Sequence, residues 1–203
     1  MSRRWLHEHH TDRYVKDARA QGYRSRAAFK LKELVDKDQL LKPGMRVVDL
    51  GAAPGGWSQV AAELVGPTGQ VIATDILPMD PIAGVHFVQG DFTEPGVFDQ
   101  ILALVGPAGT DVVISDMAPN ISGVRAADQA RSLGLAELAA EFAFEVLKPG
   151  GSLLFKIFQG GDLGDMRQTL QQAFTKVSHR KPAASRSRSS EFYVLAKGFK
   201  GRN

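Results

Sequence analysis

Lys156 is the residue whose surroundings most demand an explanation. It lies in the apolar run Leu153–Phe158 (LLFKIF), which predicts a strand buried on both faces of a sheet. Leaving a buried ammonium group unpaired is costly, so Lys156 needs a nearby carboxylate, surroundings that favour its neutral form, or access to the open edge of the sheet. Asp116, at the end of another predicted strand, is its natural partner. The pair predicts either a lysine that accepts a proton in catalysis or a purely structural ion pair.

Four aspartates stand at the ends of predicted strands, where open α/β sheets bind their ligands. They are Asp49, Asp75, Asp91 and Asp116. Asp75 is placed to accept hydrogen bonds from the ribose hydroxyls of an adenosine, and Asp91, with Phe92 beside it, to meet the adenine amino group. Any one of these aspartates could instead simply begin a turn. Four at one edge of a sheet indicate a site for an adenosine-containing ligand, with Asp116 near its reactive end.

A glycine-rich turn joins the first predicted strand to the helix after it. The stretch Val47–Ser58 (VVDLGAAPGGWS) places Gly51, Gly55 and Gly56 ahead of Trp57. The turn lacks the lysine of a phosphate-gripping loop and the glycine spacing of a dinucleotide-binding loop. It suits close backbone approach to a ligand without a polyphosphate, and the cofactor we expect is S-adenosylmethionine, a sulfonium cation that the acids would favour. An ordinary strand-to-helix turn is the alternative.

Strands and helices alternate along the chain after a helical N-terminal segment. We expect strands at 45–50, 70–75, 85–89, 111–116, 150–158, 175–179 and 191–197, and helices at 12–20, 25–37, 57–66, 95–105, 125–147 and 163–174. This alternation predicts an α/β fold with a mostly parallel sheet and helices on both faces. Ser25 is expected to cap the second helix. The residues of the long helix expected to face the core are Leu135, Leu138, Phe142 and Val146.

The basic residues lie mostly at the two ends of the chain. Residues 1–46 hold twelve Lys and Arg against six Asp and Glu, residues 47–175 hold five against fifteen, and residues 176–203 hold eight against one. Basic ends around an acidic middle are the pattern expected if the ends hold a polyanion while the middle holds a cation. Basic termini that are merely solvated are the alternative.

Length and composition narrow the classes of protein. The 203 residues, 43% of them hydrophobic, predict a single domain with a basic N-terminal extension at 1–44, a core at 45–203 and a basic loop at 180–190. The absence of cysteine excludes disulfides, cysteine-based metal sites and a cysteine nucleophile that attacks a pyrimidine ring. Neither a membrane span nor a secretory signal is recognisable. We therefore expect a cytoplasmic protein, a monomer, and chemistry that needs no metal.

The sequence resembles the FtsJ family of S-adenosylmethionine-dependent RNA 2′-O-methyltransferases along nearly its whole length. The resemblance rests on the segments Arg24–Leu31, Val47–Gln59, Leu77–Pro81, Gln89–Phe92, Ser115–Asn120, Phe155–Gly160 and Lys181–Glu191. Together these motifs are highly specific. They imply the Rossmann-like methyltransferase fold, with a mostly parallel seven-stranded sheet whose last strand is antiparallel.

The resemblance implies roles for individual residues. The catalytic Lys–Asp–Lys–Glu tetrad of the family falls on Lys30, Asp116, Lys156 and Glu191. The cofactor residues of the family fall on Gly55, Trp57, Asp75, Asp91 and Asp116, to which we add Gly51, Gly56 and Phe92. In this interpretation Lys156 accepts the proton of a ribose 2′-hydroxyl and Asp116 orients it, while Lys30 and Glu191 position the ribose.

The resemblance also implies a substrate, a uridine ribose in the 23S RNA of an assembled or nearly assembled 50S ribosomal subunit. The basic residues expected to hold RNA phosphates are Arg24, Arg26, Arg180, Lys181, Arg186 and Arg188. Enzymes that methylate the 2′-hydroxyls of transfer RNA or caps are the nearest alternative. Three other classes fit less well. A nicotinamide dehydrogenase should show the dinucleotide glycine spacing, and a catalytically silent RNA-binding assembly factor should have lost tetrad members. A methyltransferase that acts on amino groups should carry an aromatic residue in Asp116–Asn120, and this segment has none.

Overall fold

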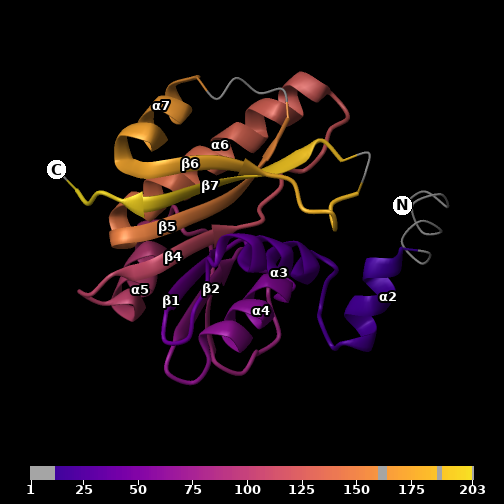
Figure 1. The fold of residues 1–203 in the computed structure, drawn as a ribbon, viewed down its shortest axis with the longest axis horizontal. Coiled ribbons are helices and arrows are strands. Elements are labelled where there is room, and N and C mark those ends of the chain that lie inside the picture. The colour runs from indigo at the N-terminus through magenta and orange to yellow at the C-terminus, as the bar shows by residue number, and fades with distance from the viewer. Residues whose placement is uncertain (1–11, 160–163, 187–188, 203) are drawn as a thin grey trace.

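A computed structural model describes residues 12–159, 164–186 and 189–202. The strands are β1 (Arg46–Leu50), β2 (Gln70–Asp75), β3 (Val85–Gln89), β4 (Thr110–Ser115), β5 (Leu147–Phe158), β6 (Phe174–Arg180) and β7 (Glu191–Phe199). The helices are α2 (Arg13–Ala20), α3 (Ala27–Asp38), α4 (Gly56–Val65), α5 (Pro95–Val105), α6 (Arg125–Val146) and α7 (Gly164–Ala173). From β1 onward strands and helices alternate as the sequence predicts, except that β3 follows β2 and β7 follows β6 without a helix between them (Figure 1).

The strands form one sheet in the order β3-β2-β1-β4-β5-β7-β6. Neighbours from β3 to β5 are parallel, and β7 runs antiparallel to both β5 and β6. The predicted fold class, a mostly parallel seven-stranded sheet with an antiparallel last strand, is therefore confirmed. The chain proceeds outward from β1 in one direction and from β4 in the other, so the order reverses between these two strands. Open α/β sheets bind ligands at such a reversal, beyond the carboxyl ends of the strands.

Two hydrophobic layers cover the two faces of the sheet. Val48 of β1 belongs to the layer formed with α5, α6 and α7, whereas its neighbour Val47 belongs to the layer formed with α3 and α4. Successive side chains of a strand point to opposite faces, so a buried strand must be apolar along its whole length. α2 packs against α3 at the edge of the second layer. None of the helices in the described part of the chain has the length and apolar character that a membrane crossing requires.

The long helix α6 corrects one prediction about the core. Phe142 and Val146 are buried as expected, but Leu135 is only partly buried and Leu138 is 37% exposed. Small side chains form most of the buried face of the helix, namely Ser132, Ala136, Ala139, Ala140 and Ala143. These alanines bring the helix close to the sheet, and the two leucines lie to one side, where they line a cavity described below.

The beginning of α3 corrects a second prediction. Ser25 does not cap the helix, because the capping position is Arg26, whose backbone is already helical and whose side chain makes no capping bond. A methyl group built on Gly56 would lie 2.3 Å from the Ser25 hydroxyl oxygen. Ser25 is therefore packed against the first residue of α4. By contrast, Asp12 does cap α2, since its carboxylate accepts a hydrogen bond from the Tyr14 main-chain N–H.

Candidate active site

A cavity of about 570 Å³ lies where the strand order reverses. It is lined by the turn after β1 and by the segments that follow β2, β3 and β4. The predicted cofactor residues that line it are Gly51, Asp75, Asp91, Phe92 and Asp116. Leu135 and Leu138 of α6 complete the wall. The structure thus brings five predicted residues from four separate segments to one place.

The turn after β1 approaches the cavity with its backbone exposed. Gly51 has a φ of +72°, in the left-handed region that side chains disfavour, and a methyl group there would lie 2.2 Å from the Met117 Cγ atom. Gly51 is therefore required both by its conformation and by the close passage of the loop after β4. A glycine here keeps the cavity open to a ligand that touches main chain.

Asp75 and Asp91 are fixed by hydrogen bonds from their own neighbourhood. The two carboxylate oxygens of Asp75 accept from the main-chain N–H groups of Ala53 at 2.9 Å and Leu77 at 2.8 Å. Asp91 accepts from the main chain and hydroxyl of Thr93 at 2.9 and 2.7 Å. An ionised carboxylate has about four acceptor sites, so both side chains retain the capacity to bind ligand hydroxyl or amino groups.

Asp49 differs from the other three strand-ending acids because it does not line the cavity. It is 1% exposed and accepts a hydrogen bond of 2.7 Å from the Ser58 hydroxyl. Burial raises the pKa of Asp49 to about 7, partly offset by the Ser58 bond and reinforced by the charges of Asp116 and Asp75. The four aspartates therefore divide into three that line the ligand cavity and one that is buried behind the glycine-rich turn.

Three predicted cofactor residues, Gly55, Gly56 and Trp57, are absent from the lining of the cavity. Trp57 is buried at 3% exposure, donates its indole N–H to the Ala27 carbonyl oxygen at 2.8 Å, and packs 5.6 Å from the ring of Tyr193. In this arrangement Trp57 joins α4 to α3 and to β7. Direct contact of these three residues with a cofactor stays a prediction.

Lys156 and Asp116 are in direct contact beside the cavity. The Lys156 Nζ atom donates to the Asp116 main-chain oxygen at 2.6 Å and lies 3.1 Å from its Oδ1 atom. A neutral lysine amine has two N–H groups and one lone pair, so two contacts with Asp116 leave the lone pair for a proton. These two contacts are compatible with a Lys156 that accepts a proton and equally with a structural ion pair between Lys156 and Asp116.

Tyr193 is a further member of this cluster that the sequence analysis did not single out. It pairs with Lys156 across β5 and β7, is fully buried, and donates its hydroxyl to Asp116 Oδ1 at 2.6 Å. Burial, together with the charges of Asp116 and Glu191, raises the pKa of Tyr193 well above its ordinary value. Its hydroxyl therefore stays a donor and holds the Asp116 carboxylate in place.

The other two tetrad residues form a second pair near the Tyr193 ring. The Lys30 Nζ atom lies 2.5 Å from Glu191 Oε1 and 6.0 Å from the centre of the Tyr193 ring. Burial alone would raise the pKa of Glu191, but Lys30 and, more weakly, Lys156 lower it below its ordinary value. Glu191 is thus a carboxylate between two lysines. The structure brings all four predicted catalytic residues together from α3, β5, β7 and the end of β4.

Contacts between the N-terminal helices and residues 181–186, the first described part of the loop before β7, hold this second pair; we call these contacts the latch. Glu33 of α3 accepts hydrogen bonds from the main-chain N–H groups of Ala183 at 2.6 Å and Ala184 at 3.0 Å. Arg26 bonds to the Ala184 carbonyl oxygen and to Asp12. The latch therefore joins α2, α3 and the loop that leads directly to Glu191.

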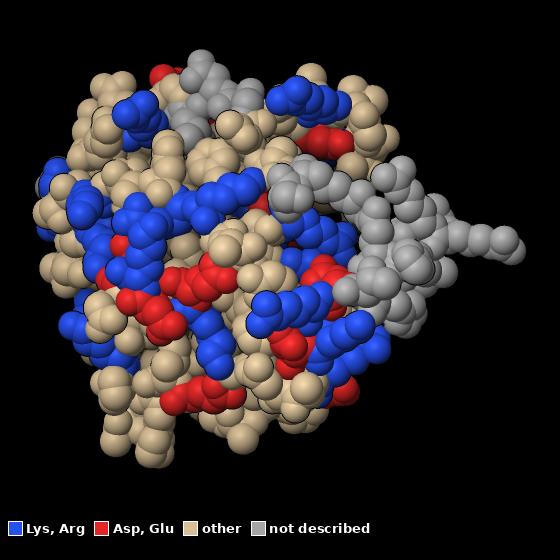
Figure 2. Space-filling model, turned by 45° about the vertical axis from the view of Figure 1, so that its right-hand side comes forward, with Lys and Arg blue, Asp and Glu red and all other residues tan. Residues whose placement is uncertain are grey.

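Several basic residues that the sequence assigns to RNA have protein partners. The face turned forward in Figure 2 is mixed, with Lys and Arg in a broad band and Asp and Glu among them. Arg180 forms a two-point pair with Asp38 at 2.8 and 2.6 Å, and Arg24 donates to the carbonyl oxygens of Asp80 and Pro81 at 2.6 and 2.7 Å. Such arginines position loops. RNA contact by them stays a prediction.

The remaining three predicted RNA-binding residues differ in their surroundings. Lys181 donates to the carbonyl oxygens of Ser189 and Glu191 at 2.5 and 2.8 Å, so it braces the loop from within. Arg186 lies 3.6 Å from Asp12 and lines a surface hollow described below. Arg188 lies outside the described residues.

Comparisons with known proteins identify the family of the chain. The family model described as FtsJ-like methyltransferase matches residues 23–199. The chain belongs to the FtsJ-like methyltransferase family. A solved structure of a Plasmodium falciparum protein described as a ribosomal RNA methyltransferase aligns with a TM-score of 0.79 and 30% identity, over 89% of this FtsJ-like methyltransferase and 100% of that chain.

Curated relatives of this FtsJ-like methyltransferase match it from end to end. The ribosomal RNA large subunit methyltransferase E of Marinobacter nauticus is 61% identical over 98% of this chain and 96% of its own length. The protein of the same name from Alkalilimnicola ehrlichii is 60% identical over 98% and 95%. The tetrad residues lie within the region that the family model covers. The protein is therefore a methyltransferase that uses a methyl donor.

Proposed function

We propose that this FtsJ-like methyltransferase transfers a methyl group from S-adenosylmethionine to the 2′-hydroxyl of a uridine in the 23S RNA of the large ribosomal subunit. The observation that carries the proposal is Lys156, held by Asp116 at the edge of an acidic cavity. The names of the relatives at 60% and 61% identity support the ribosomal substrate. We also propose that this chain acts in the cytoplasm, as a single-domain monomer.

The charge of the cavity supports S-adenosylmethionine as the cofactor. Asp75, Asp91 and Asp116 line it, while the Gly51 backbone leaves room for a ligand to approach. The described part of the chain contains no group of three His, Cys, Asp or Glu side chains that could hold a metal. Asp75 would hold the ribose hydroxyls of the cofactor and Asp91 the adenine amino group. When bound, the cofactor supplies an electrophilic methyl group on a positively charged sulfur.

Lys156 provides the proton acceptor in this proposal. A ribose 2′-hydroxyl is a very weak acid, so a base near its oxygen speeds the attack by about 10²- to 10⁴-fold. The Asp116 carbonyl oxygen and carboxylate fix the Lys156 amine, and the Tyr193 hydroxyl fixes the carboxylate. The proton of the ribose hydroxyl moves to the Lys156 Nζ atom.

Lys30 and Glu191 serve as positioning groups for the ribose. Their Nζ and Oε1 atoms are 2.5 Å apart and face the same cluster as Lys156. One cation and one carboxylate together offer a donor and an acceptor to neighbouring ribose oxygens. Most of the rate should come from the alignment of the attacking oxygen with the methyl group and the sulfur, which these two residues would support.

The test is methyl transfer from labelled S-adenosylmethionine to intact large subunits, naked 23S RNA and transfer RNA, with the wild type and Lys156→Ala. We expect label in the large subunit, in a nucleoside identified as 2′-O-methyluridine, and a loss of at least about 100-fold in the variant. Labelling of transfer RNA alone would favour the other RNA substrate, and binding of subunits without any transfer would favour an assembly factor. Undiminished methylation by the variant would exclude Lys156 as the base.

A further inference from the structure

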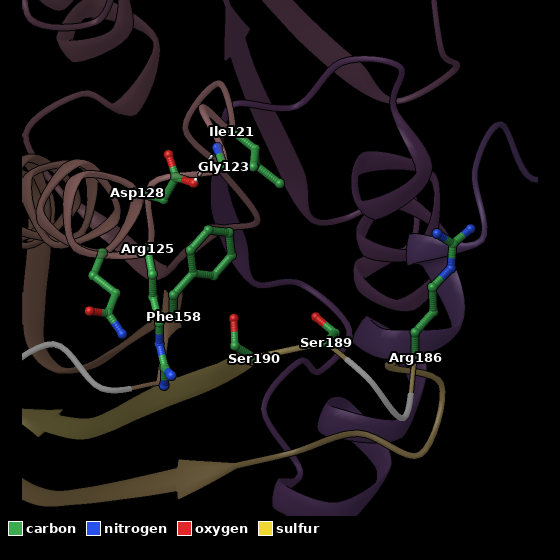
Figure 3. Close-up of a pocket in the computed structure, with 9 residues that line it drawn as sticks. Ile121, Gly123, Arg125, Asp128, Phe158, Arg186, Ser189 and Ser190 are labelled. Atoms are coloured by element: carbon green, nitrogen blue, oxygen red, sulfur yellow. Dashed lines mark hydrogen bonds between the residues drawn. The ribbon is translucent and has the colours of Figure 1, made fainter. Parts of the chain in front are cut away.

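A surface hollow of about 430 Å³ adjoins the tetrad and is separate from the cofactor cavity. Figure 3 shows the Phe158 ring between the loop that carries Ile121 and Gly123 on one side and Ser190 on the other, with Arg186 across the opening. Arg125, the first residue of α6, lines the same hollow. None of these residues has a part in the tetrad.

The position of Phe158 links the hollow to the reacting group. Phe158 lies two residues after Lys156 in β5, so both side chains project from the same face of the strand. It is the register partner of Glu191 across β5 and β7, just as Lys156 is the partner of Tyr193. The hollow therefore lies directly beyond the tetrad, at the ends of β5 and β7.

One loop separates the hollow from the cofactor cavity. Residues 117–120, directly after Asp116, line the cofactor cavity, and Ile121 and Gly123 line the hollow. The cofactor cavity thus lies on the side of β1, β2 and β4, and the hollow on the side of β5 and β7. A molecule in the hollow therefore reaches the tetrad from a side that the cofactor cavity does not occupy.

The walls of the hollow are preformed. Asp128 of α6 accepts hydrogen bonds from the Ser122 main chain and hydroxyl, both at 2.8 Å, and from the Gly123 main chain at 3.1 Å. These bonds, the Ser122 main-chain bond foremost, lower the pKa of Asp128 to about 2 although its burial opposes the shift. The Gln159 main-chain N–H donates to the Ser190 carbonyl oxygen at 2.7 Å. Hydrogen bonds therefore hold both the loop of residues 121–123 and the junction of Gln159 with Ser190 without a ligand.

The chemistry of the lining is that of a nucleotide site. A half-buried aromatic ring offers a face on which a base can stack, and Ile121, 72% exposed, adds apolar surface opposite it. Arginine side chains at the rim suit phosphate, and the Ser189 and Ser190 hydroxyls suit the polar edge of a base. The volume lies within the range of about 300 to 1,000 Å³ usual for small-ligand pockets.

We propose that this hollow binds the base of the nucleotide whose ribose is methylated, stacked on Phe158, while Arg125 and Arg186 hold the phosphates on either side. This inference rests on the proposed function and adds to it the route by which the acceptor enters. A base turned out of its stack into a preformed pocket places its own ribose toward the tetrad. Phe158 then acts in substrate binding and takes no part in proton transfer.

The test combines a change in the protein with a change in the RNA. Reconstituted large subunits carry, at the methylated position, either the natural nucleotide or a ribose without a base. With the natural subunit, Phe158→Leu should raise KM about 10-fold, within the range of about 5- to 150-fold expected for one lost base stack, while Phe158→Tyr keeps the ring and stays within about 2-fold of the wild type. With the baseless subunit, wild type and Phe158→Leu should have the same raised KM.

Equal losses from Phe158→Leu on both subunits would overturn the proposal, because the ring would then act without touching the base. So would wild-type methylation of the baseless subunit at the natural KM. Thermal unfolding and cofactor affinity of each variant verify that the fold and the cofactor cavity are intact. Failure of the wild type to methylate even the natural subunit would count against the proposed function and not against the hollow.

The rim arginine gives a second readout. Arg125→Ala should raise KM and reduce the slope of log affinity against log salt by about one, as the loss of one phosphate contact does. The matched control is Arg167→Ala, an exposed arginine of α7 that does not line the hollow. An identical effect of the two substitutions would show that Arg125 contributes only general charge, and would overturn its assignment to the hollow.

Discussion

The two sides of the active site are stabilised in different ways. On the cofactor side, the ligand-facing carboxylates accept hydrogen bonds mostly from residues two positions along the chain, as between Asp75 and Leu77 and between Asp91 and Thr93, with Ala53 the more distant donor. On the RNA-facing side, the latch joins segments about 150 residues apart, because Glu33 bonds to the loop at Ala183, and it includes the ion pair of Arg26 with Asp12. The carboxylates of the first side are thus held mostly by near neighbours in the chain, and the second side by contacts between distant segments that include an ion pair.

This difference indicates how each side responds to its surroundings. Asp75 and Asp91 accept their bonds from main-chain N–H and hydroxyl groups, so the cofactor cavity should be less sensitive to salt. The latch includes the ion pair of Arg26 with Asp12, and such a pair is weakened by salt and by loss of either partner. The RNA-facing side is therefore the part of the site that can be loosened separately. Asp116 belongs to both sides, since it lines the cofactor cavity and binds Lys156.

The largest effect should follow a change at the residue that the two sides share. Asp116→Asn removes the carboxylate that Lys156 and Tyr193 both contact. We expect kcat to fall by at least about 100-fold, because Lys156 loses the carboxylate that orients it. Cofactor affinity should fall by about 10-fold, because the sulfonium of the cofactor loses a carboxylate nearby. Single-turnover methylation and calorimetric titration with S-adenosylmethionine measure the two. A change in only one of them would show that Asp116 serves one side alone.

A smaller effect, confined to the cofactor side, is expected from Asp75→Asn. The side-chain oxygen of asparagine can accept only one of the two main-chain hydrogen bonds from Ala53 and Leu77, and its NH₂ group then faces the other main-chain N–H. Cofactor affinity should fall by about 10- to 100-fold, the usual cost of a lost hydrogen bond to a charged group. Binding of ribosomal subunits, measured by filter retention, should be unchanged. Weaker subunit binding would mean that the sides are not separable.

The latch can be broken on the RNA side alone by Glu33→Ala. Two main-chain N–H groups of the loop lose their acceptor, so the loop before Glu191 is held less firmly. We expect KM for subunits to rise about 5- to 10-fold, with cofactor affinity unaffected. Glu145→Ala is the control, because it removes an exposed pair with Arg202 and should change neither value. An equal rise in both variants would assign the effect to net charge.

The smallest effect concerns stability and Asp49. Its pKa is about 7 in the folded protein and near 3.8 in an unfolded chain. Between about pH 4 and about pH 7 the folded state therefore holds a proton that the unfolded state has lost, and the free energy of unfolding should decrease as the pH rises, by a few kcal/mol at most. Urea unfolding of the wild type and Asp49→Asn across this range measures it. The variant should lack this slope, and an unchanged slope would contradict the assignment.

The contrast between the two sides also explains what the sequence could predict. Strand-ending acids, the glycine-rich turn and the apolar runs are local patterns, so the sheet and most of the cofactor cavity could be predicted from them. The partners of Arg24 and Arg180 come from distant segments, and nothing in the local sequence shows that these side chains have internal partners. Phe158 and Tyr193 read as ordinary apolar strand residues, and only the register of β5 and β7 places them beside the tetrad.

Lys156→Arg tests most directly whether Lys156 accepts a proton or serves only as one partner of a structural ion pair. Arginine keeps the positive charge and can still pair with Asp116, but it cannot serve as a base near neutral pH. We expect the single-turnover rate to fall at least about 100-fold, as in Lys156→Ala, with cofactor affinity and thermal stability close to those of the wild type. A rate within a few-fold of the wild type would show that the Lys156–Asp116 pair is structural.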